Sequence, residues 1–409
     1  MTWLPLITEK SAQEAVYAKL HEIKEALLAN PSTTGQENLF GGDLGVSLFF
    51  LYYYKLTQDT GHLDMAENLL SNAYDGVEAN PSPTFTFASG ISGLSWATEF
   101  SRAHEFIDID TDDILSDIDP MVSNYMFGEM ERGNYDYMHG SLGAALYFLK
   151  KELTPTIREN ITTLIDQLSA LDENGKQKWQ YCYTAGQLED STNLGLSHGI
   201  PSILVLLLKA YQRNISPDKS KILIEAIVAF LLDNMQDPMI HKTYYAYSVH
   251  GSDIEAAKDT RLAWCYGDLG VCCALWQVAQ VFDDAKLKAK VLEIITYSAT
   301  SKDLNENKVF DAGLCHGSAG IAHIFNRFYQ DTNSEIFKEA ALFWYNQTLK
   351  LATFKDGLAG YKAWGGNAEQ EHTYENCTGL LEGIAGIGLA LIAAVANFEP
   401  NWDECLLIS

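Results

Sequence analysis

A short glycine motif repeats seven times along the chain, and it constrains the fold more than any other sequence feature. Each copy reads Gly-x-x-Gly or a close variant and leads into an apolar run, and consecutive first glycines lie 48 to 68 residues apart. Spacing of this length is typical of repeat architectures, and each repeat has room for two helices and their loops. The motifs begin at Gly42, Gly90, Gly140, Gly199, Gly267, Gly317 and Gly383.

The stretches before and after each motif differ in their hydrophobic pattern. Residues 46–54, which follow the first motif, are apolar on almost every side, as in a helix that is buried all round. The stretch before that motif is charged and predicts a half-buried helix, because its apolar residues form a single stripe. The stripe consists of Val16, Leu20, Ile23 and Leu27.

One half-buried and one fully buried helix per repeat predict an all-α fold. We expect a seven-fold α/α toroid, that is, a double-layered α/α barrel of seven helical hairpin repeats, in a single domain of residues 1–409. An open solenoid satisfies the same local pattern, but the fully apolar helices favour closure. Glycine at each motif would allow neighbouring helix starts to approach closely. In such a ring the residues before the first glycines would meet at one mouth, beneath a rim formed by residues 174–193 and 239–258.

The charge and the cysteine pattern limit the partners and the compartment. A net charge of -26 disfavours nucleic acid or an anionic membrane surface as a partner, because both would repel the chain. The start of the chain lacks the pattern of a signal peptide, and no apolar run reaches the roughly 18 residues that span a bilayer. The seven cysteines show no disulfide spacing, which favours a reducing, cytoplasmic location with free thiols.

Two of these cysteines stand at the same place in consecutive repeats. Cys265 and Cys315 each lie two residues before a first glycine, and His316 follows Cys315 directly. Two thiolates and one neutral imidazole are ligands that Zn²⁺ prefers, and three protein ligands leave a fourth position for water or substrate. The positive end of each following helix would also favour the thiolate form. His198 and His139 are the rival imidazoles, and the opposing interpretation is that both cysteines are small buried core residues.

Several motifs resemble those of the LanC lanthionine synthetase cyclase family, and the resemblance spans essentially the whole chain. They are Trp-Cys-Tyr-Gly at 264–267, Cys-His-Gly at 315–317, Ser-His-Gly at 197–199 and Leu-Glu-Gly-Ile-Ala-Gly-Ile-Gly at 381–388. The resemblance implies a barrel enzyme with one Zn²⁺ that adds a peptide cysteine thiol to dehydroalanine or dehydrobutyrine, forming (methyl)lanthionine rings. The motifs are not preceded by a long dehydratase region of the kind found in bifunctional enzymes, so we expect the chain to resemble the stand-alone bacterial cyclases. The implied partners are a dehydrated precursor peptide with its leader, a lanthipeptide dehydratase and an exporter.

Three further residues match family positions and fit the second half of such a reaction. Thiolate attack on a dehydro amino acid generates an enolate, which needs a proton at its α-carbon and stabilisation of its oxygen. His198 is the candidate for proton transfer, Asp136 for orienting it, and Arg261 for stabilising negative charge. A helix-capping histidine, an N-cap aspartate and an ordinary ion-paired arginine are the structural alternatives. His139 is expected to have a supporting or structural place rather than to bind metal. His372 lies in an irregular stretch, residues 369–376, and nothing in its spacing requires a contact with substrate.

Three other functions fit part of the sequence. An α/α-barrel carbohydrate-active enzyme would need two carboxylates at the mouth, where the sequence offers one glutamate and the Cys-His pair. A LanC-like protein could instead add glutathione or another soluble thiol to dehydro residues. A toroid that binds peptide as a scaffold, with purely structural zinc, is the third. The sequence does not indicate the precursor, the ring pattern or the oligomeric state.

Overall fold

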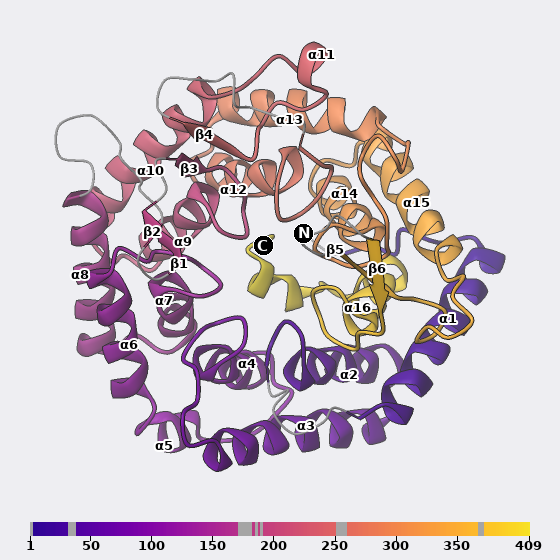
Figure 1. Ribbon diagram of the computed structural model, residues 1–409, viewed down its shortest axis with the longest axis horizontal. Coiled ribbons are helices and arrows are strands. Elements are labelled where there is room, and N and C mark those ends of the chain that lie inside the picture. The colour runs from indigo at the N-terminus through magenta and orange to yellow at the C-terminus, as the bar shows by residue number, and fades with distance from the viewer. Residues whose placement is uncertain are drawn as a thin grey trace. The chain divides into compact units, whose positions relative to one another are not determined.

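The computed structural model describes residues 3–31, 38–170, 182–184, 187–188, 191–250, 260–366 and 372–409, and these are mostly helical (Figure 1). The first glycine of every motif is the N-cap of a helix, so the predicted helix starts are confirmed. The seven glycine-capped helices of the described residues are α2 (Asp43–Thr57), α4 (Ile91–Ala103), α7 (Ser141–Lys150), α9 (Ile200–Gln212), α12 (Asp268–Val281), α14 (Ser318–Thr332) and α16 (Ile384–Val395).

The glycine motifs are needed because the preceding loop folds back over the start of the helix. A glycine N-cap has no side chain to accept the first N–H groups, and backbone carbonyls of that loop accept them instead. A Cβ at Gly320 would lie 2.0 Å from the backbone oxygen of Leu314, so only glycine fits under the loop. In four repeats the first residue of the helix donates its backbone N–H to a carbonyl oxygen of the preceding loop. These hydrogen bonds run from Ile91 to Thr84, from Ser141 to Asn134, from Ser318 to Asp311 and from Ile384 to Cys377.

A longer amphipathic helix precedes each glycine-capped helix. In α1 the buried residues include the four of the predicted stripe, whereas all residues of α16 are buried, which confirms the two kinds of helix. The amphipathic helices of the described residues are α1 (Lys10–Ala29), α3 (Thr60–Ala79), α6 (Asp119–Glu131), α8 (Pro155–Ala170), α10 (Pro217–Asp233), α13 (Ala285–Thr300) and α15 (Glu335–Lys350). Shorter elements are α5 (Thr111–Leu115), α11 (Pro238–His241) and the 3-10 helix η2 (Asn401–Leu406).

The chain forms two compact units. Unit 1 comprises residues 1–82, 261–264 and 296–404, and unit 2 comprises residues 83–260, 265–295 and 405–409. In unit 2, α7 contacts α4 and α9, and α9 contacts α12.

In unit 1, α16 contacts both α2 and α14, and α1 contacts α16 as well (Figure 1). The first and the last glycine-capped helices are therefore neighbours. Closure of the repeats into a seven-fold toroid stays a prediction. A single domain of residues 1–409 stays a prediction.

The described residues also contain three two-stranded antiparallel sheets, and the chain is otherwise mostly helical, as the all-α prediction requires. The sheets fall in the segments without helical periodicity, and the rest of the predicted rim, at 174–181, 185–186, 189–190 and 251–258, lies outside the described residues. Strands of two to four residues are too short for an alternating pattern to stand out in the sequence. The pairs are β1 (Cys182–Thr184) with β2 (Gln187–Leu188), β3 (Ser191–Asn193) with β4 (Ser248–His250), and β5 (Ala363–Gly366) with β6 (His372–Glu375).

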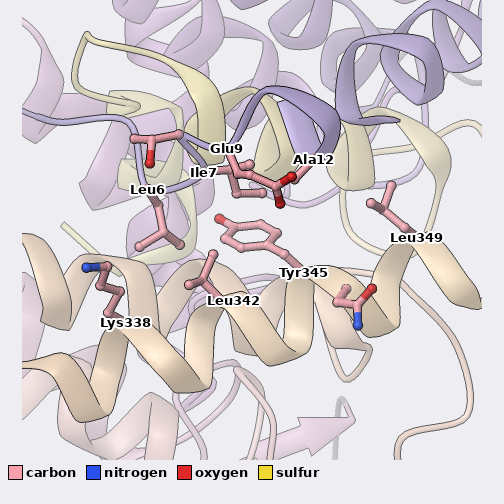
Figure 2. Close-up of a pocket in the computed structure, with 10 residues that line it drawn as sticks. Leu6, Ile7, Glu9, Ala12, Lys338, Leu342, Tyr345 and Leu349 are labelled. Atoms are coloured by element: carbon pink, nitrogen blue, oxygen red, sulfur yellow. The ribbon is translucent and has the colours of Figure 1, made fainter. Parts of the chain in front are cut away.

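A cavity of about 310 Å³ lies in unit 1 between the N-terminal segment and α15 (Figure 2). Leu6 and Ile7 face Leu342, Tyr345 and Leu349 of that helix across it. None of the residues that line the cavity is a candidate site residue. Among the described residues, no helix has both the length and the apolar character needed to cross a membrane.

Candidate metal centre and proton-transfer pair

Asp136 and His198, both in unit 2, form a hydrogen-bonded pair just before α7 and α9, which contact each other. Nδ1 of His198 lies 2.7 Å from Oδ2 of Asp136, and the two side chains are 13% and 2% exposed. An ionised carboxylate only accepts hydrogen bonds, so Nδ1 carries the hydrogen. Proton exchange is therefore left to Nε2, as in a general acid or base that a carboxylate orients.

The second oxygen of Asp136 fixes the loop that carries it. Oδ1 accepts the backbone N–H of His139 at 2.6 Å, and the N–H of Asp136 donates to Oδ1 of Asn134 at 3.2 Å. The ring of His139 lies beside that of His198, with centroids 6.0 Å apart and planes inclined by 21°. His139 is thus next to the pair, on its exposed side.

Cys265 lies in unit 2, two residues before the N-cap of α12, and is 7% exposed. Its backbone oxygen accepts from the N–H of Ser197 at 3.4 Å and from the hydroxyl of Ser197 at 3.3 Å. Gly267 has a φ of 87°, a conformation that side chains disfavour, so the chain can turn sharply between Cys265 and the helix. Cys265 is therefore held beside the loop that ends in His198.

Cys315 and His316 lie in unit 1, immediately before Gly317, the N-cap of α14. The N–H groups of Leu314 and Cys315 both donate to the backbone oxygen of Leu381 at 2.9 Å, so the loop of the following repeat holds this stretch in place. Cys315 is half-buried, and the side chain of His316 is 10% exposed. The thiol and the imidazole are thus supplied by one rigid turn.

His316 and Arg261 contact the same indole in unit 1. The rings of His316 and Trp364 meet edge to face, with centroids 5.6 Å apart, and the guanidinium of Arg261 lies 5.4 Å from the Trp364 ring centroid. The backbone N–H of Trp364 donates to Oδ2 of Asp311 at 2.8 Å, and the same oxygen lies 3.7 Å from Nε2 of His316. Trp364 therefore connects the candidate anion-stabilising residue with a candidate metal ligand.

Among the described residues, one set of three or more His, Cys, Asp or Glu side chains qualifies as a metal-binding group: Cys265, Cys315 and His316. Two sulfurs and one ring nitrogen are the donor types of zinc sites, whereas magnesium and calcium prefer oxygen. The donor set thus fits zinc, and it includes neither of the rival imidazoles, His139 and His198. Cys272 and Cys273 are buried in α12, as expected of core residues.

Sequence reasoning missed Asp311 and Trp364. Trp364 lies in a four-residue strand without a motif, so its contacts depend on long-range folding. Asp311 left a signal, because it stands six residues before a first glycine, as Asn134 and Asn193 do in their repeats. The side chain of His372, whose spacing left a substrate contact open, lies outside the described residues.

The profile of the lanthionine synthetase C-like proteins matches residues 34–407. The chain belongs to this family. Among solved structures, a nisin cyclase is similar to it with a TM-score of 0.72, at 18% identity, over 98% of both chains. At that identity the likeness shows a shared fold. A cellobiose 2-epimerase from Bacillus thermoamylovorans also matches, at 11% identity over 92% of this chain and 98% of its own, but its TM-score of 0.45 carries no argument.

Proposed function

We propose that this member of the LanC-like family is a zinc-dependent lanthipeptide cyclase. It would add cysteine thiols of a dehydrated precursor peptide to dehydroalanine or dehydrobutyrine, forming thioether rings. The observation that carries the proposal is the donor set of Cys265, Cys315 and His316 in a chain of this family. The contact between α2 and α16 supports the accompanying proposal that the seven repeats close into an α/α toroid.

The proposed chemistry divides between the metal and the residues around it. Zinc bound by two thiolates and one imidazole would lower the pKa of a substrate thiol, so that its sulfur attacks as a thiolate. The sulfur forms a bond to the β-carbon, the π-electron pair moves toward the carbonyl, and the α-carbon then takes a proton. We propose that Nε2 of His198 takes up the proton that the substrate thiol releases and then gives a proton to the α-carbon, while Nδ1 stays hydrogen-bonded to Asp136. The guanidinium of Arg261 would stabilise the developing negative charge.

A dehydrated peptide that carries cysteines tests this function directly. Thioether formation leaves the peptide mass unchanged and removes free thiols, so alkylation followed by mass spectrometry counts the rings. We expect wild type to cyclise the peptide and to contain about one zinc per chain by elemental analysis. Cys315→Ala should lose both the zinc and the activity. A wild-type protein without zinc, or with zinc but without thiol consumption, would contradict the proposal.

The same assay separates the other functions. Glutathione adducts formed in preference to rings would indicate addition of a soluble thiol. Peptide binding without any thiol consumption would indicate a scaffold, and zinc-independent turnover of a sugar would indicate a carbohydrate-active enzyme. We further propose that the protein acts in the cytoplasm and that its partners are the precursor with its leader, a dehydratase and an exporter.

A further inference from the structure

Asx residues occupy the same register position in three repeats, six residues before the first glycine. In each repeat the side-chain oxygen accepts the N–H of the residue two positions later, which is an Asx turn. The distances are 3.2 Å for Asn134, 2.8 Å for Asn193 and 3.1 Å for Asp311. This turn needs one oxygen, so asparagine and aspartate serve it equally well.

Asp311 differs from the two asparagines because it brings a second oxygen and a negative charge into a buried place. Its side chain is 1% exposed, and a buried carboxylate is costly unless it has partners. The second oxygen, Oδ2, accepts the backbone N–H of Trp364 at 2.8 Å. It also lies 3.7 Å from Nε2 of His316, which is close enough for a charge interaction but too far for a hydrogen bond. The carboxylate thus does more than form the turn.

We propose that Asp311 is a positioning residue that orients His316 for metal binding, an inference that rests on the proposed metal centre. A carboxylate beside Nε2 favours the tautomer with hydrogen on that nitrogen, which leaves Nδ1 with the lone pair that a metal needs. At 3.7 Å the carboxylate acts on Nε2 through its charge rather than through a hydrogen bond, and its negative charge makes the imidazole a stronger ligand. Trp364 contributes by fixing the carboxylate and by contacting the ring of His316.

The test replaces Asp311 with residues that occupy the equivalent position in other repeats. Asp311→Asn copies Asn134 and Asn193, and Asp311→Thr copies Thr84, so at least one variant should fold. Zinc affinity is measured by competition with a chromophoric chelator, and the absorption bands of the cobalt-substituted protein report ligand geometry. Thermal unfolding of the metal-free proteins controls for stability. Asn134→Ala is the matched control, since it removes an equivalent turn before a motif without a proposed ligand.

We expect both Asp311 variants to bind zinc about 10–100-fold more weakly than wild type and to show shifted cobalt bands. Asn134→Ala should keep wild-type zinc affinity and cobalt bands. Zinc binding by the Asp311 variants within twofold of wild type would overturn the inference and leave the proposed cyclase intact. Equal weakening in Asn134→Ala would also overturn it, because the effect would then be structural. A wild-type protein that binds no zinc would refute the metal centre and the inference together.

Discussion

A buried ion pair in unit 1 gives the sharpest stability prediction. Asp403, at 0% side-chain exposure, accepts from Nε of Arg327 at 2.7 Å and from Nη2 at 2.8 Å. Nε2 of His323 lies 2.7 Å from the same carboxylate and is equally buried. Asp403 therefore fixes η2 to α14 through one carboxylate with three close nitrogen partners.

Asp403→Asn keeps the size of the side chain and removes its charge, which leaves Arg327 without its buried counter-ion. Breaking such a pair costs about 3–5 kcal/mol. The exposed Glu399 still accepts from Arg327 at 2.8 Å, so we expect the lower end, about 3 kcal/mol.

The effect depends on pH with a definite sign. Burial opposes ionisation of Asp403, but Arg327 and His323 outweigh it and hold the pKa of this carboxyl below its usual range. A carboxyl whose folded pKa is depressed contributes stability that is fully present above its unfolded pKa, about 4. That contribution is lost as the pH falls toward the folded pKa. The difference between wild type and Asp403→Asn should therefore shrink below about pH 4.

Urea unfolding followed by tryptophan fluorescence at pH 7 and pH 3.5 measures both effects. The control is Lys219→Met, which removes an ion pair with Asp166 in which both side chains are about half exposed, and it should cost under about 1 kcal/mol. The reasoning is refuted if Asp403→Asn costs no more than this control at pH 7. It is also refuted if the difference from wild type grows as the pH falls.

Three further predictions concern the candidate site and its helices. Trp364→Ala should lower kcat less in an Arg261→Ala background than in wild type, with a coupling of about 0.5–2 kcal/mol, whereas additive effects would show that the indole does not act through the guanidinium. His198→Ala should reduce kcat by about 10²–10⁴-fold at unchanged zinc content, and a near-normal rate would exclude it as the proton donor. Gly320→Ala should lower the free energy of unfolding, measured in urea, by about 1–3 kcal/mol, because its Cβ would meet the backbone oxygen of Leu314. Gly128→Ala should raise it by up to about 1 kcal/mol, because a Cβ there meets no atom within 4 Å.

The helical framework could be predicted from the sequence because its causes are local. A glycine before an apolar run marks a helix start wherever the loop folds back onto the helix, and this held for all seven motifs. The stripe from Val16 to Leu27 is buried for the same reason, since 3.6-residue periodicity directly reports one buried face. The family resemblance predicts that Asp136 orients His198, although the two motifs are 62 residues apart in the chain.

The missed residues depend on contacts that no local pattern encodes. Trp364 meets Arg261 only because a short hairpin and a distant loop fold together, so neither residue predicts the other. The cluster of Asp403 with Arg327 unites a C-terminal turn with a helix 76 residues earlier in the chain. Asp311 was predictable in part, because the register of the repeats identifies its turn, but the turn alone does not reveal the proximity to His316.

The hydrogen bonds at the start of α14 bear on how a thiolate of Cys315 would be stabilised. The sequence suggests that the positive end of the helix supports the thiolate of Cys315. However, the first four N–H groups of this helix all donate to backbone oxygens, which offset most of their partial charge. A negative sulfur two residues before the N-cap thus gains little from the helix. Under the proposed function, zinc bound by the donor set would supply the stabilisation. The four donors are Ser318 to Asp311, Ala319 to Ala312, Gly320 to Gly313 and Ile321 to Gly317.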